Sequence, residues 1–294
     1  MNLRFCILAA VLVMPLGAQE DPLRAGLEQT YNAWRNSVVT RNEMTWRKVT
    51  ATHRQVMVKN RILSEKLPYP ASIFELPGTP PSIGEMKYLG SRRSGPTAKS
   101  YYLGRVDFGN GPTQTENLLV LGFVGAAESW RYDQADFINL AALPEVRQEL
   151  AAGDLRYIDA SPELLPSGQV PPTPNEVAEA PYIAKVYAFC PGRQVRANVN
   201  GVSPHVFEDD QQAQIIIGGA RPGANQLQFS ISELDPMQPA TGALTVRVYL
   251  MSQIEGVKPV KVYQYQVDAG QRYEPQITAQ FIVDQKVHDA LMGK

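Results

Sequence analysis

Cysteine and histidine are scarce in this chain of 294 residues. It contains two cysteines, Cys6 and Cys190, and three widely separated histidines, His53, His205 and His288. A structural zinc site needs cysteine or histidine ligands at short spacings, and a disulfide framework needs several cysteines. The composition therefore predicts neither a metal centre nor a disulfide-stapled fold, and we expect no cofactor.

The motifs of common nucleotide-binding and hydrolytic enzymes are also missing. The sequence has no phosphate-binding Gly-Lys loop, no dinucleotide glycine fingerprint, no His-Glu-x-x-His pair and no Gly-x-Ser-x-Gly elbow. A Ser-His-Asp triad assembled from distant segments stays open, with His53 or His205 as its base. We assign no catalytic residue and expect a non-enzymatic role.

Neither sign of charge dominates the composition. The chain has 28 basic and 29 acidic residues, a formal net charge of −1, and an isoelectric point near 6.3. Nucleic-acid-binding domains usually carry a basic excess and an isoelectric point above about 9. Nucleic acid is therefore not an expected partner.

Long apolar runs are absent beyond the first 20 residues. Arg4 precedes an apolar stretch from Phe5 to Leu16, and the small residues Gly17 and Ala18 follow. This pattern is typical of a cleaved secretory signal, and it is shorter than the about 20 apolar residues of a membrane span. We expect residues 1–19 to be removed, and the rest to be exported to the periplasm or the outside without a membrane span.

Loss of the signal would remove Cys6 and leave Cys190 as the remaining thiol. Free cysteine is among the most buried residue types, so Cys190 fits a small buried residue at a strand end. An intermolecular disulfide or a reactive thiol is the alternative.

A proline-rich segment divides the sequence. Residues 161–181 contain six prolines, which remove backbone donors and fix φ, so an extended and semi-rigid connector is expected. We predict a first domain over residues 20–160, a linker over 161–181 and a second domain over 182–294.

Two helices are predicted at the start of the first domain. Apolar residues recur at steps of three or four over residues 22–39, which indicates an amphipathic helix. A second helix is expected from Thr40, with Thr40 and Glu43 as a capping box, to Leu67. His53 and Asn60 interrupt its apolar stripe. They either form hydrogen bonds at the rim of a core or face an internal cavity.

Strand patterns follow from about residue 85 to 135. Ser100–Phe108 and Glu116–Val124 predict a hairpin around the turn dipeptide Asn110-Gly111. Arg92 and Arg93 fall in a predicted loop between Gly90 and Gly95. A short helix is expected from Pro144 to Ala152, ending at Gly153.

The first half resembles the cone-shaped α+β fold of the ketosteroid-isomerase-like, or SnoaL-like, superfamily. The resemblance is carried by Leu-x3-Leu-x3-Tyr-x2-Trp over Leu23–Trp34, by the run Leu118–Phe123, and by Trp130-Arg131-Tyr132-Asp133 with Phe137. It implies a helix-plus-curved-antiparallel-sheet domain with a pocket between the helices and the sheet.

Enzymes of that superfamily use a carboxylate base and a tyrosine or carboxylic-acid donor, because burial raises a carboxyl pKa toward neutrality. The resemblance makes Tyr31 and Asp107 the nearest candidates, with His53 as a third. The alternative that the residues themselves favour is core packing for Tyr31 and, for Asp107 beside a turn, bonding to local backbone.

The second half predicts strands throughout residues 182–282. We expect Tyr182–Cys190, Gln194–Asn200, Gln214–Gly218, Gln226–Ile231, Leu244–Met251, Pro259–Val267 and Gln276–Val283. Seven short strands in about 100 residues are typical of a β-sandwich. The Pro-Gly-x-Asn-x-Leu-x-Phe element within Arg221–Phe229 resembles immunoglobulin-like extracellular modules, which implies an all-β immunoglobulin-like sandwich. A short helix with Val283, Val287 and Leu291 on one face is expected to close the chain.

The hairpin of residues 244–267 holds the candidate binding residues Tyr249, Tyr263 and Tyr265. If these tyrosines share an outward face, they form an aromatic patch suited to another envelope protein or to a glycan. Alternation alone does not choose the face, so an inward position of Tyr263 and Tyr265 stays open.

The sequence favours an exported, non-enzymatic interaction or assembly protein. The alternatives are glycan binding, or small-molecule binding or enzymatic activity in the N-terminal pocket.

Overall fold

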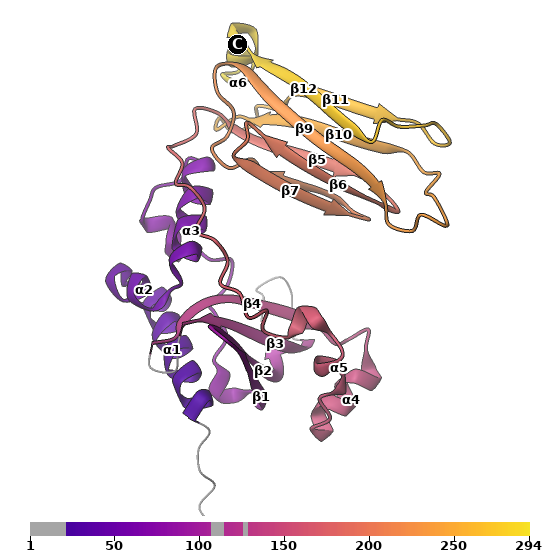
Figure 1. The fold of residues 1–294 in the computed structure, drawn as a ribbon. Helices are drawn as coiled ribbons and strands as arrows, with labels where there is room; N and C mark the ends of the chain where they lie inside the picture. Colours follow the sequence, from indigo (N-terminus) through magenta and orange to yellow (C-terminus); the bar gives the residue numbers. More distant parts are fainter. Residues whose placement is uncertain (1–21, 107–114, 126–128) are drawn as a thin grey trace, which may run out of the picture. The chain divides into compact units, whose positions relative to one another are not determined.

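The computed structural model describes residues 22–106, 115–125 and 129–294, and it is a mixed α/β structure (Figure 1). The described residues form six α-helices and three antiparallel sheets of four strands each. They divide into two compact units, one of residues 22–33, 81–106, 115–125 and 129–170 and one of residues 34–80 and 171–294. The domain limits inferred from the sequence stay a prediction. The predicted signal and the Asn110-Gly111 turn lie outside the described residues.

The first unit contains a sheet of four consecutive strands. In order across the sheet these are β1 (Lys87–Ser94), β2 (Thr97–Val106), β3 (Thr115–Val124) and β4 (Arg131–Asn139). β2 and β3 pair antiparallel, as predicted, with Thr97 opposite Val124. The side chains from Leu118 to Leu121 are all 0% exposed. β3 is therefore covered on both faces, which accounts for its unbroken apolar run.

Helices cover both faces of this sheet. Tyr101, Leu118 and Val120 pack on one face against Leu150 of α4 (Pro144–Ala152), Ile158 of α5 (Arg156–Asp159) and Leu164. α4 ends before Gly153, which has φ of 90°, so the predicted helix is confirmed. On the other face the Tyr31 ring of α1 (Pro22–Val39) lies 5.8 Å from the ring of Tyr132.

The second unit begins with the end of α1, and α1 has the predicted bounds. The single second helix that we expected is wrong, because the chain forms α2 (Glu43–Val49) and α3 (Thr52–Ser64). Thr50 and Ala51 are extended between them, and the Gln55 side-chain amide donates to the Thr50 carbonyl. The break is hard to see in the sequence because the apolar spacing continues across it.

The expected capping box is also wrong. The Asn42 side chain caps α2 by accepting from the Thr45 amide at 3.0 Å. The Thr40 hydroxyl instead donates to the Asn36 carbonyl at the end of α1. Asparagine is among the strongest N-cap residues, so Asn42 satisfies an amide that has no partner within the helix.

Asn60 attaches α3 to the proline-rich segment. Its Nδ2 donates to the Asn175 carbonyl at 2.8 Å, and its Oδ1 accepts from the Val177 amide at 3.0 Å. One turn later, Ser64 Oγ accepts from the Gly218 amide at 2.8 Å. The polar positions on α3 therefore hold backbone groups that have no partner in regular secondary structure.

The second unit also contains eight strands in two sheets, and we call them the double sheet. The strands are β5 (Ile183–Phe189), β6 (Arg193–Val199), β7 (Ser203–Glu208), β8 (Gln211–Ile215), β9 (Gly223–Glu233), β10 (Leu244–Met251), β11 (Val260–Val267) and β12 (Gln276–Val283). The strand orders are β11-β10-β5-β8 and β12-β9-β6-β7. The two sheets lie face to face in Figure 1 and share one apolar core, which includes Val186, Val195, Phe229 and Val248.

One of these strands, β7, is missing from the seven that we predicted. A tight turn at Asn200 and Gly201, with φ of 54° and 70°, leads from β6 into β7. The chain ends with α6 (Gln285–Leu291), which confirms the predicted short helix. Cys190 follows β5 and is 0% exposed, so it takes the position of a small buried residue.

Asn225 stabilises the turn before β9. Its Oδ1 accepts from the Arg221 amide at 2.9 Å and from Asn200 Nδ2 at 3.0 Å, and its Nδ2 donates to the Arg221 carbonyl at 2.8 Å. Asn225 is 1% exposed. One side chain therefore joins the 221–225 turn to the β6–β7 turn.

We expect Asn225→Ala to lower the free energy of unfolding by about 2–3 kcal/mol, because it leaves buried donors and acceptors without partners. Gln228→Ala is the matched control, since Gln228 is exposed on the same strand, and it should cost less than about 0.5 kcal/mol. Urea unfolding of both variants measures the difference. Equal costs would contradict the assigned role of Asn225.

Candidate functional site

The three residues that the sequence placed in a pocket have different positions. Tyr31 belongs to the first unit, is buried, and donates its hydroxyl proton to the Pro81 carbonyl at 2.9 Å. His53 belongs to the second unit and is 3% exposed on α3. Asp107 lies outside the described residues. A pocket shared by the three stays a prediction.

A tyrosine and a carboxylate do meet in the first unit, but at other positions. The Tyr102 hydroxyl donates to Glu28 at 3.2 Å, and burial together with Glu28 raises the pKa of Tyr102. Arg24 forms an ion pair with Glu28 at 2.8 Å and lies 4.0 Å from the centre of the Tyr88 ring. The Glu28 carboxylate is therefore paired with the Arg24 guanidinium and the Tyr102 hydroxyl. The contact with Tyr102 connects α1 to β2, and the contact of Arg24 with Tyr88 connects α1 to β1.

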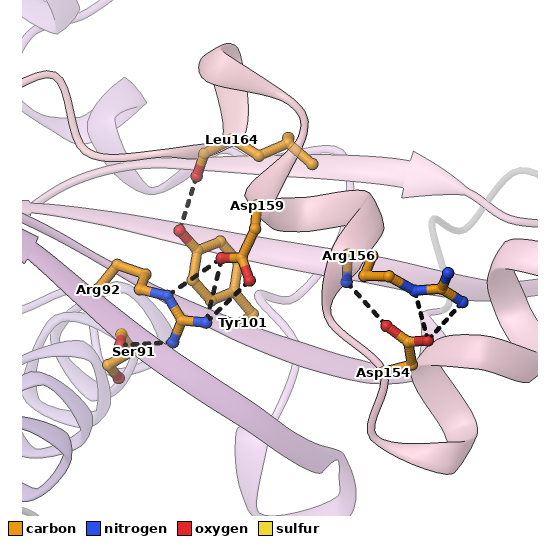
Figure 2. Close-up of polar contacts among 7 residues, drawn as sticks. All are labelled: Ser91, Arg92, Tyr101, Asp154, Arg156, Asp159 and Leu164. Carbon is orange, nitrogen blue, oxygen red and sulfur yellow. Dashed lines mark hydrogen bonds and ion pairs between the residues drawn. The ribbon is translucent and has the colours of Figure 1, made fainter.

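A second polar cluster of this unit is centred on Tyr101 and Arg92 (Figure 2). Arg92 and Arg93 lie in β1, paired with β2, so the predicted loop is wrong. Arg92 Nη2 lies 3.1 Å from Asp159 Oδ1. The buried Tyr101 hydroxyl donates to the Leu164 carbonyl at 2.8 Å. Burial raises the pKa of Tyr101 to about 12, although Arg92 opposes the shift. Tyr101 is therefore a neutral donor that holds residues 159–164 on the sheet.

The three tyrosines of the β10–β11 hairpin do not share one face. Tyr263 and Tyr265 pack against the core of the double sheet, with ring centres 6.4 and 5.4 Å from that of Phe229. Tyr249 alternates with the core residues Val248 and Leu250, so it lies on the outer face. The single aromatic patch is therefore not formed, because Tyr263 and Tyr265 are needed to fill the core.

A different set of side chains lies on the outer face of β5 and β10. We call it the aromatic face, and its members are Tyr187, Phe189, Arg247 and Tyr249. Tyr187 lies directly opposite Arg247 across the strand pair. The Arg247 guanidinium is 5.9 Å from the centre of the Tyr187 ring, and its Nη1 is 3.5 Å from the Tyr249 hydroxyl. All four side chains are half-buried.

The sequence contained a signal for this face. The inward residues of β5 are small, Ala184, Val186 and Ala188, and they are fully buried. The bulky residues alternate with them and must lie outside. We predicted the strand but did not use the difference in side-chain size to choose the face.

Ser203, His205 and Gln214 have the connectivity of a hydrolase triad. The Ser203 hydroxyl lies 2.8 Å from His205 Nε2, and His205 Nδ1 lies 3.0 Å from Gln214 Oε1. Because Gln214 Oε1 only accepts, Nδ1 carries the proton and Nε2 accepts from Ser203. The Ser203 oxygen also accepts from the Ile217 amide at 2.7 Å.

Burial makes this triad unsuitable for nucleophilic attack. Ser203 is 0% exposed and His205 is 5% exposed. Gln214 is neutral, so it cannot stabilise an imidazolium ion as the aspartate of a triad does. Burial lowers the pKa of His205. The geometry is therefore that of a neutral hydrogen-bonded network that joins β7 to β8.

A buried ion pair lies elsewhere in the double sheet. Arg193, whose side chain is 3% exposed, is 3.2 Å from Glu233. Glu233 also accepts from the Tyr273 hydroxyl at 2.7 Å and the Ala240 amide at 2.9 Å. Burial alone would raise the pKa of Glu233, but these donors outweigh it and lower the pKa. The carboxylate is fully engaged in holding the 234–242 loop.

Metal ligands do not gather in the described part of the chain, where no three His, Cys, Asp or Glu side chains are placed to hold a metal ion. Burial raises the pKa of the Cys190 thiol, which disfavours the reactive thiolate form.

Among helices of the described residues, none combines the length and hydrophobicity that crossing a membrane requires.

Comparison of the chain with models of protein families, with curated proteins and with solved structures gives no match in any of the three.

His205 predicts a dependence of stability on pH. Its pKa is below 6.5 in the folded chain, so the unfolded chain binds more protons between that lowered pKa and 6.5. The contribution of His205 to stability is complete above 6.5 and falls as the pH drops through this window. His205→Gln should be less stable at neutral pH but should lose less on acidification. Urea unfolding at about pH 7.5 and about pH 5.5 measures both effects, and parallel losses in the two proteins would rule out this role.

Proposed function

We propose that this is an exported, non-enzymatic protein of the cell envelope that binds a protein partner through the aromatic face. The observation that carries the proposal is the grouping of Tyr187, Arg247 and Tyr249 on the outside of a sheet. Tyrosine and arginine are enriched among the residues that dominate the binding energy of protein interfaces.

The state of the side chains supports this use. Tyr187, Phe189 and Tyr249 are half-buried, and Arg247 contacts both Tyr187 and Tyr249, so these side chains are partly ordered before binding and lose less conformational entropy. Arg247 Nε is shielded from water and has no hydrogen-bond partner among the described residues. Leaving such a donor unsatisfied costs free energy, and this cost falls if the Arg247 guanidinium moves toward a carbonyl or carboxylate of a bound partner.

The proposal includes the finer architecture inferred from the sequence. The first domain would be a helix-plus-curved-sheet cone and the double sheet an immunoglobulin-like sandwich, with residues 161–181 as the linker. Support for the sandwich comes from the shared core of the two sheets and from the turn that Asn225 stabilises. Support for the cone comes from the placement of Tyr31 against Tyr132 on one face of its sheet.

Glycan binding by the same face is the second candidate. Gln264 lies opposite Arg247 and Gln266 opposite Thr245 on the neighbouring strand. The Gln264 amide donates to Gln266 at 3.0 Å, so amide groups flank the aromatic rings. Aromatic rings beside amide groups suit the apolar faces and hydroxyl groups of sugars.

Crosslinking of a tagged copy in its native host, followed by mass spectrometry, tests the proposal. We expect a reproducible envelope protein crosslinked near the aromatic face. Tyr187→Ser combined with Tyr249→Ser should reduce this product by about tenfold or more.

The matched control is Thr278→Ala with Gln280→Ala, since these residues are exposed on β12 of the other sheet. This control should leave the product unchanged, and thermal melting should show that both variants fold. An unchanged crosslink in the folded tyrosine variant would overturn the proposal. Loss of the crosslink in the presence of a soluble oligosaccharide would favour the glycan reading.

A further inference from the structure

Positive charge is concentrated in one short stretch of a chain whose net charge is −1. Residues 39–62 contain one acidic residue, Glu43, and six basic residues, Arg41, Arg47, Lys48, Arg54, Lys59 and Arg61. All of them lie in the second unit, on α2, on α3 or just before α2. The near-neutral total charge therefore hides a strongly cationic segment.

The geometry of α2 places a methionine and a lysine on its outer side. Trp46 is 3% exposed and packs with Val38 and Ile62. At about 100° per residue, Met44 and Lys48 lie on the side of α2 opposite Trp46, one turn apart. Met44 is 80% exposed.

A similar stripe runs along α3. The buried residues of this helix are His53, Asn60, Ile62 and Ser64. Met57 is 46% exposed, and it stands three residues after Arg54 and four before Arg61, so the three side chains are neighbours on the helix surface. An exposed methionine thus lies beside cationic side chains on α3 as well.

Three of the cations have no anionic partner within the described parts of the chain. Arg47 pairs with Glu43, Lys59 with Glu176 and Arg61 with Glu65. Arg41, Lys48 and Arg54, by contrast, form no ion pair with any described residue. Val39, beside Arg41, is 53% exposed. We call the set of Val39, Arg41, Met44, Lys48, Arg54 and Met57 the cationic face, a name that covers the exposed sides of α2, of α3 and of the segment before α2.

We infer that the cationic face binds the surface of a membrane that contains anionic phospholipid. The unpaired cations complement the charge of the headgroups, and each basic residue near such a surface adds favourable free energy. The exposed methionine and valine side chains can enter the boundary between headgroups and acyl chains. A hydrated polyanion would satisfy the charges but would leave these apolar side chains in water, so the lipid surface fits both properties.

Vesicle cosedimentation of the purified full chain tests this inference. The protein should bind vesicles of phosphatidylglycerol and phosphatidylcholine, bind poorly to phosphatidylcholine alone, and be released by salt. Arg41→Gln, Lys48→Gln and Arg54→Gln together should weaken partitioning by roughly 20-fold or more. Met44→Ser should weaken it by a few-fold, at unchanged charge.

The matched control removes the same charge from exposed positions on the double sheet and just before β11, through Arg196→Gln, Lys261→Gln and Lys258→Gln. It should keep most of the binding, and urea unfolding should show that all variants are folded. Equal losses in the two triple variants would show attraction by net charge alone and would overturn the inference. Absence of vesicle binding at low salt, with or without binding to heparin, would overturn it too.

Discussion

The second unit depends on hydrogen bonds that join parts of the chain more than 100 residues apart. The proline-rich segment and the Gly218 turn contain backbone groups that no strand or helix satisfies, and α3 supplies their partners from Asn60, Ser64 and the Leu63 carbonyl. Unpaired backbone groups away from water are costly, so these contacts set the position of the helices on the double sheet. The aromatic face and the cationic face therefore belong to one folded body.

Secondary structure was predictable wherever a local signal and the tertiary contacts agreed. The bounds of α1 follow from apolar spacing, and the end of α4 follows from Gly153 in the left-handed region. The prediction failed at Thr50 and Ala51, because Gln55 satisfies the carbonyls of a break that the apolar periodicity conceals. It also failed for β7, which was not among the predicted strands. His205 of β7 contacts Gln214 of β8, and this contact between strands cannot be read from local sequence.

The candidate site was less predictable than the fold, since it depends on which side of a strand faces the core. Tyr263 and Tyr265 go inward because the facing sheet presents Phe229 to them, and this contact joins distant parts of the sequence. Tyr187 lies on the outer face because its neighbours Val186 and Ala188 are the residues of β5 that are buried in the core of the double sheet. The size of the side chains indicates which side of a strand faces the core, whereas their polarity does not. How large a side chain the core can hold depends on the space between the two sheets, which is set only when both sheets are assembled.

The burial of Cys190 has a practical consequence. It is the only thiol of the chain after Cys6, and it sits inside the core at the end of β5 with its sulfur 3.7 Å from the Asp210 carbonyl. A thiol-specific reagent can reach this sulfur only when the strands around it separate. The rate of labelling at Cys190 therefore reports how often the double sheet opens under native conditions, and it does so without any introduced probe.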